Sequence, residues 1–75
     1  METYSNFGRD SGVVAFEIGR DYILVQFSDG SIYEYTSISV GRRNLDEMAR
    51  LARQGEGLNS FINRMVRQRY SRRIA

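Results

Sequence analysis

The fold of this chain is decided by residues 22–36, which read YILVQFSDGSIYEYT. Two runs rich in β-branched and aromatic residues flank an Asp-Gly pair, which is typical of two strands joined by a tight turn. A two-residue turn would pair Phe27 with Ile32, whereas a three-residue loop with Gly30 in a left-handed bulge would pair Val25 with Tyr33. We prefer the second register because a one-residue slip would mix apolar and polar side chains on each face. This register places five apolar or aromatic side chains on one face of the sheet, those of Ile23, Val25, Phe27, Tyr33 and Tyr35.

The rest of the chain adds one strand before this hairpin and two helices after it. Residues 13–18, VVAFEI, predict a strand that a Gly-Arg-Asp turn connects to the hairpin. Beyond residue 40 the apolar residues recur at helical spacing, interrupted by Gly55-Glu56-Gly57. The apolar positions of the two predicted helices are Leu45, Met48, Ala49, Leu51, Ala52, Leu58, Phe61, Ile62, Met65 and Val66. We therefore expect an α+β fold, a three-stranded antiparallel β-meander followed by two short α-helices packed on one face.

The 75 residues are enough for one domain. The polar residues 1–12 are expected to form a flexible N-terminal arm, and residues 13–75 a single domain. So small a core supplies little net stability, and the second face of the meander is predicted to be apolar. We therefore expect a homo-oligomer, a dimer or a larger assembly. The expected apolar residues of that second face are Val14, Phe16, Ile18, Leu24 and Ile32.

The composition argues against several classes of protein. Cysteine and histidine are both absent, which removes disulfides, the usual zinc ligands and the commonest general base. The acidic residues form no paired constellation suited to acid–base catalysis or to magnesium. No apolar run approaches the roughly 20 residues of a membrane span, and the start lacks a signal-peptide core. We expect a cytoplasmic protein that is not an enzyme and has no metal, no cofactor and no membrane association.

The charge of the chain is divided between its two halves. Residues 1–40 carry two arginines against six acids, a net charge of −4, and residues 41–75 carry nine arginines against three acids, a net charge of +6. Every basic residue is arginine, whose planar guanidinium binds phosphate bidentately and stacks on bases. The C-terminal segment has five of them around Tyr70, on what reads as a continuation of the second helix. This pattern predicts a surface that meets an anionic ligand.

Several of these motifs together resemble the KTSC domain, a family named from the C-terminus of some lysyl-tRNA synthetases and also found as a free-standing small protein. The resemblance covers residues 12–73 and rests on Ile23-x-Val25-x-Phe27, Gly30, Tyr33-x-Tyr35 and Asn63-x-x-Val66-Arg67-x-x-Tyr70. Two positions depart from the family pattern, Gly41 and Ser71, where prolines are usual. The resemblance implies the same α+β arrangement. An RNA-binding role has been suggested for the family.

The sequence therefore favours a non-catalytic module that binds phosphorylated ligands, RNA before others, through an arginine-rich C-terminal helix. One alternative is a homo-oligomer that sequesters small nucleotides or cyclic nucleotides, and another is a protein–protein interaction module. Tyr33 and Tyr35 could stack on bases, although the register turns them towards the helices, and Arg67 could serve a structural ion pair instead. The candidate ligand-binding residues are Tyr33, Tyr35, Asn63, Arg64, Arg67, Arg69, Tyr70, Arg72 and Arg73.

Overall fold

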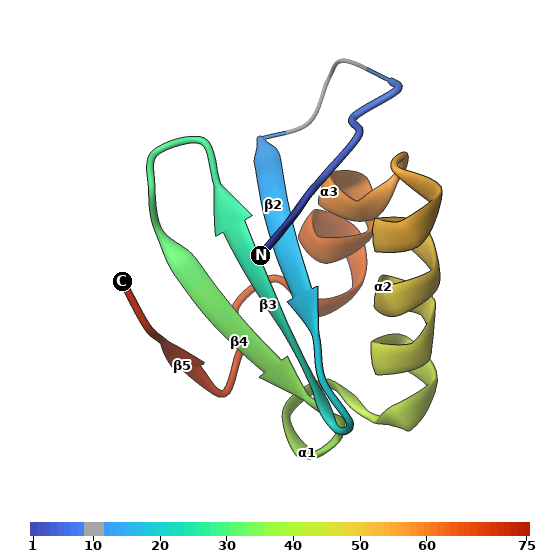
Figure 1. The fold of residues 1–75 in the computed structure, drawn as a ribbon. Helices are drawn as coiled ribbons and strands as arrows, with labels where there is room; N and C mark the ends of the chain where they lie inside the picture. The colour runs from blue at the N-terminus through green and yellow to red at the C-terminus, as the bar shows by residue number, and fades with distance from the viewer. Residues whose placement is uncertain (9–11) are drawn as a thin grey trace.

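The computed structural model describes residues 1–8 and 12–75, and it shows one antiparallel sheet with helices over one of its faces (Figure 1). The five strands lie in chain order, β1 (Glu2–Thr3), β2 (Val13–Ile18), β3 (Tyr22–Phe27), β4 (Ile32–Thr36) and β5 (Arg72–Arg73). The helical elements are α1 (Ser37–Val40), α2 (Arg42–Gln54), α3 (Leu58–Phe61) and the π-helix η1 (Ile62–Val66). The α+β class is confirmed. The count of three strands is wrong, because each end of the chain adds a two-residue edge strand.

The turn between β3 and β4 has the predicted three-residue geometry. Gly30 has a φ of 90°, a left-handed conformation that glycine adopts without steric cost. Val25 pairs with Tyr33 and Ile23 with Tyr35, as the preferred register requires. Ser31 donates to Asp29 from its backbone N–H (2.9 Å) and from its hydroxyl (2.6 Å), which lowers the pKa of that carboxyl. The turn thereby places both tyrosines on the face that the helices cover.

β2 carries an irregularity that the alternating pattern did not predict. The pairing with β3 shifts between Val13 and Ala15, so Val13 and Phe16 both point into the core although they are three residues apart. Phe16 is 3% exposed, while Val14 is 42% exposed. The expectation that Phe16 lies on the second, open face is therefore wrong, since a bulge inverts the inside–outside order of the strand.

The open face of the sheet is consequently more polar than expected. A row of paired residues crosses it, from Glu17 through Leu24 and Glu34 to Arg72. Ile18, which was also expected there, packs against the core instead. Only part of the apolar surface on which the prediction of a homo-oligomer rested is present on the open face. Self-association therefore stays a prediction.

The N-terminal residues that were expected in an arm include one core residue. Tyr4 follows β1 and is buried, and its hydroxyl accepts a hydrogen bond from the backbone N–H of Leu58 at 3.1 Å. That N–H belongs to the first residue of α3, where no intrahelical partner is available. The side chain thus fastens the start of the chain to the start of a helix 54 positions later.

The second predicted helix ends earlier than expected. α2 stops at Gly55 in a left-handed conformation, and α3 begins after Gly57 and passes directly into η1. The helical path ends at Val66, after which the chain crosses to the far edge of the sheet and pairs with β4 (Figure 1). The prediction of an arginine-rich C-terminal helix is therefore wrong, because residues 67–75 contain a loop and a strand.

Candidate functional site

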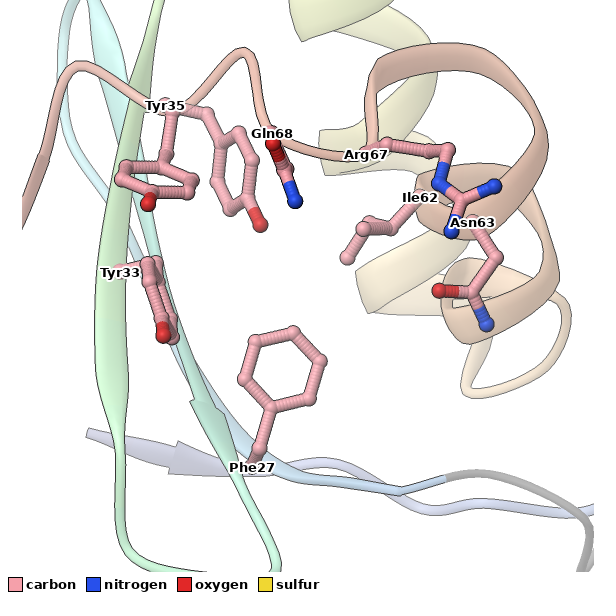
Figure 2. Close-up of a pocket in the computed structure, with 8 residues that line it drawn as sticks. Phe27, Tyr33, Tyr35, Ile62, Asn63, Arg67 and Gln68 are labelled. Carbon is pink, nitrogen blue, oxygen red and sulfur yellow. The ribbon is translucent and has the colours of Figure 1, made fainter.

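A pocket of about 260 Å³ lies between the sheet and the end of the helical path (Figure 2). It unites five of the nine predicted ligand-binding residues, from two distant parts of the sequence. Its lining consists of Phe27, Tyr33, Tyr35, Ile62, Asn63, Arg67, Gln68 and Tyr70. The pocket is open to solvent on the side of the last four polar residues, all of which are exposed.

The sheet supplies an aromatic wall. The rings of Phe27 and Tyr33 meet edge to face with centroids 5.9 Å apart, and Tyr70 lies against Tyr33 at 4.6 Å and against Tyr35 at 6.4 Å. Tyr35 is 2% exposed and Tyr33 is half-buried, so the predicted packing towards the helices is confirmed. Within the described chain no hydrogen bond occupies any of the three hydroxyls.

Burial affects the acidity of this wall. It raises the pKa of the Tyr35 hydroxyl to about 12, and the nearby phenols of Tyr33 and Tyr70 act in the same direction. Tyr35 therefore stays protonated at neutral pH and can donate a hydrogen bond into the pocket. It is a poor general base for the same reason.

The opposite wall is built at the π-helix. The backbone N–H of Arg67 donates to the carbonyl oxygen of Ile62 at 2.6 Å, five residues back, which is the bond that defines a π-turn. Arg67 then has a φ of 27°, a conformation that side-chain-bearing residues rarely adopt. π-turns and strained backbone both concentrate at functional sites. Figure 2 shows Asn63 and Arg67 on this wall, across the pocket from Phe27 and Tyr33.

Residues 68–75, which we call the C-terminal strap, close a third side. The strap is bonded to Glu34 of β4, whose backbone oxygen accepts a hydrogen bond from the N–H of Ser71 at 2.7 Å. The carboxylate of Glu34 also accepts the Ser71 hydroxyl at 2.6 Å and the Arg72 Nε at 3.1 Å. These bonds, that of Ser71 first, lower the pKa of Glu34 against the opposing effect of burial. Tyr70 directly precedes Ser71 and is held at the pocket by these bonds.

The five arginines of the C-terminal segment fall into three groups by position. Arg67 lines the pocket, and Arg73 lies at its rim, with its guanidinium carbon 5.6 Å from the Tyr33 ring centroid. Arg64 and Arg69 are exposed and outside the lining. Arg72 lies on the open face in an ion pair with Glu34. The expectation that Arg67 serves a structural ion pair is wrong for the described residues, in which its guanidinium has no carboxylate partner.

The pocket holds positive charge without compensating negative charge. Its lining contains one guanidinium and two side-chain amides but no carboxylate. The side chains of Asn63 and Gln68 make no hydrogen bond to the rest of the described chain, so their amides and the guanidinium are all available to a ligand. Phe27, Ile62 and Gln68 were not predicted as site residues. Phe27 could have been found from its place on the same sheet face as the tyrosines.

Residues 1–8 and 12–75 contain no cluster of acidic side chains that could hold a metal ion. None of the helices in these segments has both the length and the apolar character required to cross a bilayer. Searches against protein-family models, curated proteins and solved structures found no match to this chain. The resemblance to the KTSC domain therefore stays a prediction.

Proposed function

We propose that this domain is a non-catalytic binding module for single-stranded RNA. The observation that carries the proposal is the convergence of three tyrosines, two free amides and a free guanidinium on one open pocket without a carboxylate. Proteins that recognise unpaired RNA commonly hold splayed bases against aromatic side chains on a sheet and bond the base edges with polar groups. This pocket has both kinds of group on facing walls.

The arginines around the pocket suit the phosphates of such a strand. Arg67 lies inside it, Arg73 stands at one rim, and Arg69 lies between them in the sequence on the strap. A strand whose base enters the pocket would leave its backbone on the solvent side, where these guanidinium groups are exposed. Neutralising phosphates makes affinity fall steeply with salt concentration.

The chemistry of the lining supports binding without catalysis. The chain has no histidine or cysteine, and the lining has no carboxylate that could act as a general base. The tyrosine with the most perturbed acidity, Tyr35, is held in its protonated form at neutral pH. Such a site can bind and orient a ligand but has no group suited to proton abstraction.

The test is fluorescence anisotropy with a labelled 12-nucleotide single-stranded RNA at several salt concentrations. Arg67→Gln removes the guanidinium of the pocket, and Arg64→Gln, on η1 but outside the lining, removes the same charge and serves as the matched control. Hydrogen bonds to charged groups contribute about 1.5–3 kcal/mol. We expect Arg67→Gln to weaken binding about 10–100-fold and Arg64→Gln less than about 3-fold.

Three results would overturn the proposal. One is the absence of RNA binding by the folded wild-type protein at about 50 mM salt, where phosphate contacts are strongest. Another is an equal loss in both variants, because it would indicate diffuse attraction to the basic segment. The third is tighter binding of a free mononucleotide than of the RNA, which would instead support nucleotide sequestration. Circular dichroism of each variant checks that the fold is retained.

A further inference from the structure

The C-terminal strap presents different residues to the two faces of the sheet. In the pairing of β5 with β4, Arg73 lies beside Tyr33. Its neighbour Arg72 lies beside Glu34. Because successive side chains of a strand point to opposite faces, Arg73 reaches the pocket while Arg72 lies on the open face. A contact on the open face can therefore fix what the strap presents to the pocket.

Glu34 makes the side-chain contacts that fasten the strap. Among the described residues, every hydrogen bond from a strap side chain to another part of the chain ends on Glu34. Its side chain is 17% exposed, and its carboxylate accepts from Ser71 and Arg72. Backbone bonds also join the strap to β4, but all of its residues are exposed to water. Since exposed backbone bonds open readily, the Glu34 side chain is important to the closed position.

Two groups at the pocket depend on this attachment. Tyr70 directly precedes Ser71, and its ring centroid lies 4.6 Å from that of Tyr33. Arg73 directly follows Arg72, and its guanidinium carbon lies 5.6 Å from the centroid of the same ring. Displacement of the strap would remove both groups from the aromatic wall together.

From these contacts we infer that Glu34, which lies outside the pocket, is a positioning residue that makes RNA binding depend on its negative charge. The inference rests on the proposed RNA-binding function and specifies how that site is regulated. The charged carboxylate holds Tyr70 and Arg73 at the pocket through the strap. A protonated carboxyl loses the charge-assisted part of its bonds. Because only molecules with a closed strap present the complete site, the apparent affinity falls with the closed fraction.

The expected direction is opposite to that of simple electrostatics. Neutralising an acid makes the protein more positive and leaves Arg72 without its ion pair, and both changes favour a polyanion. Glu17 lies in the same row of the open face, where Tyr22 donates its hydroxyl to it at 3.0 Å. Neutralising Glu17 adds the same charge but removes no strap contact among the described residues. Weaker binding on neutralisation is therefore expected for Glu34 and not for Glu17.

The pH range of the effect follows from the same contacts. The hydrogen bond from Ser71, the largest influence, lowers the pKa of Glu34, burial opposes it, and Arg72 adds to the lowering. The carboxylate is therefore charged at neutral pH. Its contribution is complete above its unfolded pKa, about 4.3, and is lost as the pH falls through the folded value. We expect RNA affinity to fall over this range, between about pH 6 and about pH 3.

The experiment measures fluorescence anisotropy with a labelled 12-nucleotide oligouridylate at a fixed low salt concentration. Uracil does not ionise in acid, so the charge of the RNA stays constant. At neutral pH we expect Glu34→Gln to weaken binding about 3–10-fold, because the closed fraction limits the affinity. Glu17→Gln, the matched control, should bind as tightly as the wild-type protein or more tightly. As the pH is lowered, the wild-type affinity should fall towards that of Glu34→Gln, whose own affinity should not fall.

A second background tests whether Glu34 acts through the strap. In Tyr70→Ala/Arg73→Gln the groups that it positions are missing, so Glu34→Gln should then change the affinity less than about 2-fold. The inference is overturned, and RNA binding stands, if Glu34→Gln weakens binding equally in that background, if it binds as tightly as the wild-type protein, or if Glu17→Gln causes the same loss. If the wild-type protein binds no RNA, the proposed function fails and the inference with it. Circular dichroism checks the fold at each pH.

Discussion

The substitution Glu34→Gln tests whether the C-terminal strap is held by its carboxylate. In the wild-type protein one oxygen of Glu34 accepts both the Ser71 hydroxyl, at 2.6 Å, and the Arg72 Nε, at 3.1 Å. Glutamine has nearly the same shape and keeps an acceptor oxygen, but it has no charge. The backbone bond from Ser71 to residue 34 does not depend on the side chain and should remain.

The expected loss follows from these contacts. A hydrogen bond to a charged group contributes about 1.5–3 kcal/mol, against about 0.5–1.5 kcal/mol for a neutral pair. The Arg72 side chain is 68% exposed, so its ion pair adds at most about 1 kcal/mol. We therefore expect Glu34→Gln to destabilise the closed strap by about 1–2 kcal/mol. The open fraction of the strap would rise about 5–30-fold.

Amide hydrogen exchange measures this opening residue by residue. The reporting amides are Ser71, bonded to the Glu34 carbonyl, and Ile74, bonded to the Ile32 carbonyl at 2.7 Å. Their protection should fall by the stated factor relative to the amides of β3 in the middle of the sheet. Glu47→Gln removes a comparable exposed pair with Arg50 on α2 and should leave both amides unchanged.

The pH dependence of amide protection in the strap tests the Glu34 contacts in a second way. Because the pKa of Glu34 is lowered in the folded protein, the contribution of the carboxylate is complete above its unfolded value, about 4.3, and is lost as the pH falls through the folded value. Strap protection in the wild-type protein should therefore approach that of Glu34→Gln as the pH is lowered from about 6 to about 3. If the two proteins have equal protection at pH 6, the carboxylate does not hold the strap.

Three further predictions concern the fold and are measured by urea denaturation. Tyr4→Phe should cost about 1–3 kcal/mol, because the buried N–H of Leu58 loses its acceptor; an unchanged midpoint would contradict the bond. Phe16→Ala should cost about 3–5 kcal/mol and Val14→Ala less than about 0.5 kcal/mol, and the reverse order would refute the bulge in β2. Gly30→Ala should cost about 1–2 kcal/mol through its positive φ alone, because no atom lies within 4 Å of the added Cβ; no loss would refute the left-handed turn.

The hairpin could be predicted from sequence because its constraints are local. Gly30 permits the left-handed turn, and one register places Ile23 and Val25 on the same side as Tyr33 and Tyr35. The other register divides them between the two faces, so the apolar pattern and the turn chemistry agree on one answer. That agreement also placed Tyr33 and Tyr35 on the face that the helices cover.

β2 could not be predicted in the same way, because its bulge depends on pairing with its neighbours. In the run VVAFEI nearly every position is apolar, so the sequence does not mark which side chains face inward. The structure buries Val13 and Phe16 against β3, and this spacing of three requires the extra residue. A run of apolar residues fits either face, and only contact with the adjacent strand selects one.

The end of the chain shows why five residues of the pocket could be named from the sequence although its geometry could not. In a continuing helix with 3.6 residues per turn, Asn63, Arg67 and Tyr70 would share one side, roughly a quarter turn from Ile62 and Val66, and Arg72 and Arg73 could not pair with β4 as they do. The π-turn and the positive φ of Arg67 end the helix there, although no glycine or proline marks the position. Backbone strain of this kind costs about 1–3 kcal/mol, and the contacts of the strap with Glu34 oppose its release. The break turns the chain back to the sheet and so unites the basic segment with the tyrosine pair, two sets of residues that a straight helix would have kept apart.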